Sequence, residues 1–313
     1  MLLSDPIFSD ADKAREHLEA TRWPNGPVCP HCGVVDQATN IGGKAARAGC
    51  YQCNACREQF TVTVGTVFER SKVPLNKWLL ASFLMASSKK GISAHQIGRS
   101  LGVTYKTAWF MCHRLRAAMD PIYNAPPTPM GGARKTIEMD ETYIGNDPSK
   151  PRPKGARGFQ HKMAVFALVE RGGSVRSFHI DNADQDTVRS IVRANVHPHS
   201  KHYTDGGGIY RENAMRLRGH DWVDHGADEY VRGDVHTNTI EGFFSIFKRG
   251  MKGVYQHCSE KHLARYLAEF DFRYNNREKL GVNDMARTAN ALKGAKGKRL
   301  TYRRLDWSDE APQ

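Results

Sequence analysis

The sequence has little cysteine, no long apolar run and a deficit of acidic residues. Its 7 cysteines are too few and too unevenly spaced among 313 residues for a disulfide framework. No window approaches the roughly 18 consecutive apolar residues of a membrane span. The N-terminus also lacks a basic segment followed by an apolar core. We therefore expect no membrane partner and a cytoplasmic protein.

The charge balance favours nucleic acid as the partner. Lys plus Arg number 46 and Asp plus Glu number 33, so the formal net charge is +13. Such an excess attracts a polyanion, and double-stranded DNA is the partner that we expect. The length allows a catalytic core of about 150 residues together with smaller modules.

Four cysteines form two knuckles with zinc-ribbon spacing. Cys29 and Cys32 make the first C-x-x-C pair, and Cys53 and Cys56 make the second. Thiolates paired in this way suit one tetrahedral Zn²⁺, which typically contributes about 10 kcal/mol or more to the folding of such a module. Cys50 makes an overlapping pair with Cys53 and is an alternative ligand, although a strand expected just before Cys53 favours the first set.

A compact two-helix pattern follows the ribbon. Ser93 and Thr104 are typical helix caps, and Gly102 supplies the turn between the helices. This pattern is typical of a helix-turn-helix, whose second helix can enter a major groove. The alternative is a helical hairpin that only braces the next domain. The candidates for DNA contact on the polar side of the second helix are Tyr105, Lys106, Thr107, His113 and Arg114.

A mixed sheet is expected after a stretch rich in proline and glycine. Three consecutive strands are predicted at 135–145, 161–171 and 174–181, and helices and strands then alternate. Three strands in a row followed by alternation describe an α/β domain with a mixed sheet and helices on its faces.

These patterns predict five parts of the chain. They are an N-terminal segment with a zinc ribbon, a helix-turn-helix region, a linker, a catalytic domain and a basic tail. Their expected bounds are 1–72, 73–120, 121–133, 134–290 and 291–313.

A basic loop is expected between the first two strands of the catalytic domain, because prolines and glycines interrupt that segment. Its cations can hold DNA phosphates, although a run of charge is also typical of ordinary solvated surface. The cations are Lys150, Arg152, Lys154 and Arg157.

Three acidic residues lie where such a domain places ligands. Asp140 lies in the first strand among apolar neighbours, where an ionised carboxylate needs a partner. Asp205 ends a short strand before three glycines, a position typical of ligand sites, although a turn role also explains it. Glu241 begins a helix that carries Lys248 on the same face. Asn238 and Glu241 together also match a variant of a capping box.

In combination, these motifs resemble those of the bacterial insertion-sequence transposases of the ISXO-like group, relatives of the eukaryotic Merlin elements. The resemblance extends from about residue 25 to 280. It rests on the segments CPHC, YQCNACREQF, GTVFERSKVPLNKW, MDETYIG, TDGGG, HTNTIEGFFSIFKRGMKGVY and HLARYLAEFDFRYNNR.

The resemblance implies an RNase H-like, retroviral-integrase-like core with DDE chemistry. Asp140, Asp205 and Glu241 correspond to the three acids, and Lys248 to the basic residue that follows them. Many members of the group carry Asn at the third position, so Asn238 and Glu241 are both candidates for that ligand. Two Mg²⁺ or Mn²⁺ ions would activate the nucleophile and stabilise the leaving oxygen. Hard carboxylate oxygens suit these ions, whereas thiolates select Zn²⁺.

The implied activity is DNA transposition. The enzyme would bind terminal inverted repeats, hydrolyse a phosphodiester at each end and transfer the freed strand into target DNA. We expect a homo-oligomer on DNA that is associated with the nucleoid, because two ends must be paired. The alternatives are a zinc-ribbon DNA-binding regulator without cleavage activity and a nuclease of the same fold without strand transfer.

Overall fold

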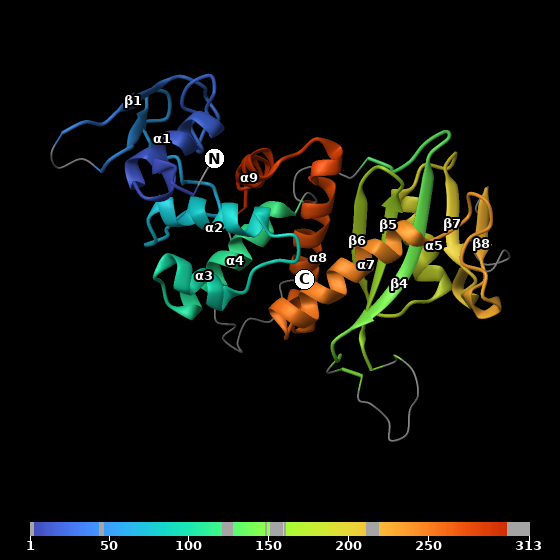
Figure 1. Ribbon diagram of the computed structural model, residues 1–313. Coiled ribbons are helices and arrows are strands. Elements are labelled where there is room, and N and C mark those ends of the chain that lie inside the picture. Colours follow the sequence, from blue (N-terminus) through green and yellow to red (C-terminus); the bar gives the residue numbers. More distant parts are fainter. Residues whose placement is uncertain are drawn as a thin grey trace.

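Two structural halves lie side by side (Figure 1). A helical half with a small sheet comes first, and a five-stranded sheet with its covering helices follows. Helix α8 (Glu260–Asn275) stands between them, because it packs against both α4 (Tyr105–Met119) and β6 (Val175–Ile180). The structure, a computed structural model, describes residues 3–43, 47–120, 128–147, 149–150, 159, 161–210 and 219–298.

A short three-stranded sheet organises the N-terminal module. Strands β1 (Ala38–Asn40), β2 (Tyr51–Cys53) and β3 (Gln59–Phe60) pair antiparallel in that order. Helix α1 (Ala11–Arg22) precedes them, and the carboxylate of Asp10 caps it by accepting two backbone N–H groups of its first turn. Strands this short bury little apolar surface, so this module needs another source of stability.

Three helices build the rest of the first half. Helices α2 (Leu75–Ser87) and α3 (Ala94–Leu101) precede α4. The hydroxyls of Ser93 and Thr104 accept backbone N–H groups at 3.1 and 3.3 Å, as expected for helix caps. Gly102 ends α3 with φ +60°, a left-handed conformation that glycine adopts without steric cost.

The expectation that His113 and Arg114 lie on a polar face of α4 is wrong. Both are buried, because the C-terminal part of α4 is enclosed by α8 and by the segment before α2. The ring of His113 contacts that of His262, with 4.8 Å between centroids. The guanidinium of Arg114 donates to the carbonyl of Glu69 at 3.1 Å. The other candidates, Tyr105, Lys106 and Thr107, are at least partly exposed.

The second half is built on a mixed sheet of order β6-β5-β4-β7-β8. Strands β4 (Thr136–Ile144), β5 (Met163–Glu170) and β6 are antiparallel neighbours, as predicted. Strands β7 (Lys201–Asp205) and β8 (His220–Val223) continue the sheet in parallel with β4. This order, with β4 at the centre, is that of an RNase H-like fold. Sequence reasoning missed β8, whose four residues are mostly not buried.

Helices cover both faces of this sheet. Helices α7 (Asn238–Gly250) and α8 pack on one face through residues such as Phe247. Helix α5 (Gln185–Asn195) packs on the other face through residues such as Val192. All residues from Met163 to Val169 are buried because β5 has a helix over each face. Figure 1 shows α7 crossing in front of the sheet beside β4.

The last helix returns to the first half. In α9 (Asp284–Lys293), Ala291 and Leu292 belong to the apolar cluster of the N-terminal helices. Beyond it, Lys298 is buried and its ammonium donates to the carbonyl of Asp120. The expected boundary before the basic tail therefore falls inside a packed helix.

Short helical turns connect the longer elements. They are η1 (Pro6–Phe8), η3 (Gly208–Tyr210), η4 (His225–Ala227), the π-helical η5 (Met251–Tyr255) and η6 (Glu278–Leu280).

The helices of the described ranges are short compared with a membrane-spanning helix. Within the described ranges the longest helix, α8, has 16 residues. No helix there is both long enough and apolar enough to cross a membrane.

Candidate active site and zinc site

The structure brings four cysteines together in the N-terminal module. The sulfur atoms of Cys29, Cys32, Cys53 and Cys56 all lie within 4.8 Å of one another. The Cys29 and Cys56 sulfurs are 3.7 Å apart, and those of Cys32 and Cys53 are 3.6 Å apart. A tetrahedron with Zn–S bonds of about 2.3 Å has edges of roughly 3.8 Å, so the cluster fits one Zn²⁺. Cys50 is not part of it.

A backbone N–H group favours the thiolate form of Cys53. The N–H of Cys56 donates to the sulfur of Cys53 at 3.5 Å and is the main cause that lowers the pKa of Cys53 to about 6. Metal ligation requires deprotonated sulfur, so the turn after Cys53 is already arranged for a cation.

Asp140 and Asp205 are placed by the register of two parallel strands. Strand β4 pairs with β7 so that Glu138 lies opposite Tyr203. Two residues further along each strand come Asp140 and Asp205, which therefore point to the same face of the sheet. The carboxylate of Asp205 accepts the N–H of Gly207 at 3.1 Å, and that of Asp140 accepts the N–H of Glu141 at 2.8 Å.

Helix α7 supplies the third acid. Glu241 lies in the first turn of the helix and accepts a hydrogen bond of 2.8 Å from the hydroxyl of Thr237. Thr237 occupies the cap position and Asn238 is the first helical residue. The interpretation of Asn238 and Glu241 as a capping box is therefore wrong, because the helix begins one residue earlier than that motif requires. Asn238 is exposed.

A cavity of about 680 Å³ lies between β4 and α7. Asp140 and Glu241 line it, together with Lys248. The wall beyond them is strongly basic, because α7 and the turn after it add Arg249 and Lys252. The lining residues are Asp140, Glu141, Thr142, Glu241, Phe244, Ser245, Lys248, Arg249, Lys252 and Gly253.

Several carboxylates lie near one another at the cavity. Burial raises the pKa of Asp140 well above its usual range, and the carboxylates of Glu141, Asp205 and Glu241 raise it further. Each of these three carboxylates is therefore close enough to Asp140 to disfavour its ionised form. A bound cation would remove this repulsion, so the hard oxygen donors of the site fit Mg²⁺ or Mn²⁺. Among the described residues, only the four cysteines have potential metal-ligand atoms that all lie within 4.8 Å of one another. The carboxylate oxygens of the acids are more widely spaced than that.

Glu141 follows Asp140 along the cavity wall, but its side chain extends to the opposite face of β4. Its carboxylate accepts a hydrogen bond from the hydroxyl of Tyr210, which is buried beneath the site. Burial raises the pKa of Glu141, and the charge of Asp205 adds to this effect. Glu141 thus contributes negative charge to the site from the far side of the strand.

The predicted basic loop lies mostly outside the described residues. Lys150 is described, and its ammonium lies 3.3 Å from a carboxylate oxygen of Asp147. It also donates to the carbonyl of Asp181. Arg152, Lys154 and Arg157 lie outside the described residues.

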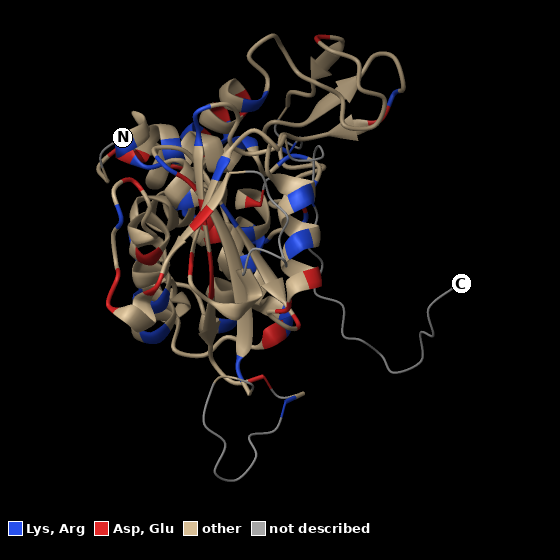
Figure 2. Cartoon of the chain, turned by 90° about the vertical axis from the view of Figure 1, so that its right-hand side faces the viewer, with Lys and Arg blue, Asp and Glu red and all other residues tan. Residues whose placement is uncertain are grey.

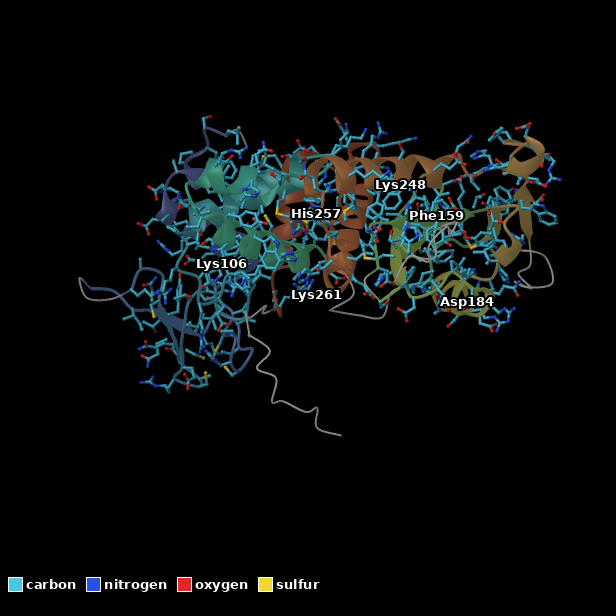
Figure 3. All side chains as sticks on the ribbon, turned by 90° about the horizontal axis from the view of Figure 1, so that it is seen from below. Lys106, Phe159, Asp184, Lys248, His257 and Lys261 are labelled. Carbon is cyan, nitrogen blue, oxygen red and sulfur yellow. The ribbon has the colours of Figure 1, made fainter. Side chains whose placement is uncertain are left out.

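Sequence reasoning missed several residues of the site. Arg249 and Lys252 could have been found, because they follow Glu241 at helical spacing, Arg249 on α7 and Lys252 in the turn after it. His225 carried no local signal, yet its Nε2 atom lies 3.8 Å from an oxygen of Glu241. Figure 2 shows acidic positions in the middle of the sheet and basic positions along the helices around it. Figure 3 shows Lys248 over the sheet half and Lys106 on the helical half.

Comparisons with known proteins agree with this architecture. A family model for the ISXO2-like transposase domain matches residues 131–275, and one for the transposase zinc-ribbon domain matches residues 9–59. An uncharacterized protein in transposable element ISH50 of Halobacterium salinarum is 30% identical over 282 residues, which cover 85% of this chain and 91% of that protein.

A solved structure is also similar, but too weakly to support an argument. It is a chain of the simian T-cell lymphotropic virus intasome in complex with the PP2A regulatory subunit B56 gamma. The identity is 15% and the TM-score 0.29, over 61% of this chain and 66% of that one. The two family models and the ISH50 relative show that the chain belongs to the ISXO2-like insertion-sequence transposases and has a transposase zinc ribbon at its N-terminus.

Proposed function

We propose that the chain is a DDE-type transposase that cleaves DNA at the ends of an insertion sequence and joins those ends to target DNA. The observation that carries the proposal is the placement of Asp140 beside Asp205 on one face of the sheet and beside Glu241 in one cavity. Burial raises the pKa of Asp140, and the charges of Glu141, Asp205 and Glu241 raise it further. Carboxylates that repel one another in a basic protein need a cation as partner, and phosphodiester chemistry uses such cations.

The three acids would hold Mg²⁺ or Mn²⁺, and such an ion would supply the Lewis-acid chemistry that phosphodiester cleavage and strand transfer need. The side chains of Lys248, Arg249 and Lys252 line the same cavity and would hold the phosphates of the strand being cut. Asn238 is exposed at the helix start and does not line the cavity, so we assign the third position to Glu241.

The helical half would bind the terminal repeats. At the start of α4, Tyr105 and Lys106 are exposed, and Thr107 is partly exposed. A capped helix with such an N-terminal end can contact base edges in a major groove. Lys150 and the basic segment that follows it would contribute phosphate contacts with little sequence preference. A homo-oligomer would pair two ends.

Two substitutions test this proposal. Asp140→Asn and Asp205→Asn should abolish Mg²⁺-dependent cleavage of a labelled terminal repeat and leave binding of that repeat unchanged, because both residues belong to strands of the five-stranded sheet and not to the helices that would bind the repeat. Asn238→Ala is the matched control, and it should cleave like the wild type.

The same assay separates the alternatives. Cleavage that survives in either Asp variant contradicts the assignment of the acids. Specific binding of the repeat without any cleavage by the wild type would support a DNA-binding regulator. Cleavage without joining of the labelled end to a plasmid would identify a nuclease.

A further inference from the structure

A buried carboxylate two residues before Asp140 ties the central strand to the start of α7. Glu138 is fully buried. Its Oε2 atom accepts the backbone N–H groups of Thr239 and Ile240 at 2.8 and 2.9 Å, and its Oε1 atom accepts the hydroxyl of Thr239 at 2.8 Å. The first N–H groups of a helix have no partner within it. Since Thr237 caps none of them with its side chain, Glu138 performs that role from the strand.

Arg171 holds Glu138 and the chain that leads into α7. Its Nε atom donates to Oε1 of Glu138 at 2.6 Å. Its terminal nitrogens donate to the carbonyl and carboxylate of Asp234, both at 2.9 Å, and to the carbonyl of His236 at 3.0 Å. The buried charge of Glu138 is thus paired, and the approach to α7 is fixed at several points.

The same network reaches the neighbouring strand. The guanidinium of Arg171 lies over the ring of Tyr203, 5.0 Å from its centroid. The hydroxyl of Tyr203 donates to Asp234 at 3.2 Å. Tyr203 also pairs with Glu138 in the register of β4 and β7.

Each acid of the site therefore follows a member of one network by two residues. Asp140 follows Glu138 and Asp205 follows Tyr203. Glu241 follows Thr239. A displacement of Glu138 would move the N-terminus of α7, and Glu241 with it, relative to Asp140.

We infer that Glu138 is a positioning residue that sets the separation of Asp140 and Glu241 for divalent-metal binding. The inference rests on the proposed function, because it takes these acids as the metal ligands. Groups that orient metal ligands typically contribute 10- to 100-fold to metal affinity. Glu138 does not touch the metal or the DNA in this role.

The test is a titration of the zinc-loaded protein with Mn²⁺, in which electron paramagnetic resonance measures how much Mn²⁺ is bound. Glu138→Gln keeps the size of the side chain and an acceptor for the helix, but it loses the charge that Arg171 pairs. We expect Mn²⁺ to bind about 10- to 100-fold more weakly. The Mg²⁺ concentration for half-maximal cleavage should rise by a similar factor, and the affinity for a terminal repeat should stay unchanged.

A matched control comes from the adjacent strand. Glu170 of β5 also pairs with a cation, since Lys135 lies 3.1 Å from it, and it accepts the N–H of Gly131. It makes none of the hydrogen bonds to the start of α7. Glu170→Gln should bind Mn²⁺ like the wild type, although it loses an ion pair of the same sheet.

A smaller change tests the same contact in case Glu138→Gln does not fold. Thr239→Ala removes the hydroxyl that donates to Glu138, together with one methyl group, and should weaken Mn²⁺ binding in the same direction. If Glu138→Gln does not fold, Thr239→Ala decides the question. Mn²⁺ affinity within twofold of the wild type in the folded variants would overturn the positioning role.

Mn²⁺ binding by Asp140→Asn distinguishes a failure of the positioning role from a failure of the proposed function. Lost Mn²⁺ binding in Asp140→Asn together with unchanged binding in Glu138→Gln would leave the function standing and reject the positioning role. Unchanged Mn²⁺ binding in Asp140→Asn would reject the metal site itself, and the positioning role with it.

Discussion

Arg116 of α4 and Glu269 of α8 form an ion pair of 2.6 Å in which the two side chains are only 2% and 0% exposed. Arg273 donates to the second oxygen of the same carboxylate, and the hydroxyl of Tyr255 donates to it at 2.6 Å. Burial alone would raise the pKa of Glu269, but Arg273 and Arg116 lower it to about 2. The pair joins α4, the proposed DNA-binding helix, to α8, which packs on the five-stranded sheet, so these elements should move as one body.

Glu269→Gln should therefore destabilise the protein strongly. The two buried guanidinium groups of Arg116 and Arg273 would lose the carboxylate with which each forms an ion pair, and breaking a buried pair in this way costs about 3 to 5 kcal/mol. Urea denaturation at pH 7 would measure the change in the free energy of unfolding. Glu278→Gln, a change of an exposed carboxylate shortly after the same helix, should stay within about 0.5 kcal/mol of the wild type. Equal stability of both variants would contradict the arrangement.

Asp140→Asn should stabilise the zinc-loaded protein at neutral pH when its acidic site holds no Mg²⁺. The folded-state pKa of Asp140 is raised by burial and by its acidic neighbours. The stability linked to this group is therefore fully present below its unfolded pKa and is lost as pH rises through the folded pKa. Asparagine cannot ionise, so the zinc-loaded variant avoids this loss and should melt at a higher temperature when neither Mg²⁺ nor Mn²⁺ is added.

When Mg²⁺ is added, the wild type should melt at a higher temperature than Asp140→Asn. A ligand present at 100 times its Kd stabilises the state that binds it by about 2.7 kcal/mol, and only the wild type keeps the complete site. Thermal melts with and without Mg²⁺ check both expectations. Asp186→Asn is the control, because this acid on α5 is 91% exposed and should leave both melts unchanged.

The two overlapping C-x-x-C pairs make a sharp prediction for zinc. Cys53→Ser should lose the metal and unfold the ribbon, because one of four sulfurs within 4.8 Å is removed. Cys50→Ser should keep one Zn²⁺ per chain, since that sulfur is not part of the cluster. Metal analysis of the purified variants distinguishes the two. Loss of zinc from Cys50→Ser would show that the ligand set differs from the one in the structure.

The sequence predicts much of the fold where the signal is local. Ser93 and Thr104 cap helices in the structure because capping depends on residues only three positions away. The strand pattern around Asp140 is also local, since alternating apolar residues reflect the two faces of β4. The zinc set follows from the spacing within each knuckle.

The parts that sequence reasoning missed depend on distant contacts. Arg116 meets Glu269 across 153 positions, so nothing near α4 indicates that its second half is enclosed. Glu138 binds partners 33 and 101 positions away. The residues around Glu138 indicate only a polar residue in a strand. Its contact with the start of α7 is visible only in the folded chain.

Asp271 should make stability fall as pH rises through neutrality. This buried carboxylate of α8 accepts the N–H and the hydroxyl of Ser177 on β6, both at 2.7 Å. Burial raises its pKa from 3.8 to about 7. Its contribution to stability is therefore fully present below pH 3.8 and is lost as pH rises through about 7.

Asp271→Asn removes this titration, so the variant should depend less on pH than the wild type. The difference in the free energy of unfolding between the two proteins should shift in favour of the variant by a few kcal/mol between pH 4 and 8.5, because each pKa unit corresponds to about 1.4 kcal/mol. Comparing the two proteins cancels groups that titrate in both, Asp140 among them. Parallel pH profiles from urea denaturation would contradict a neutral, buried Asp271 at low pH.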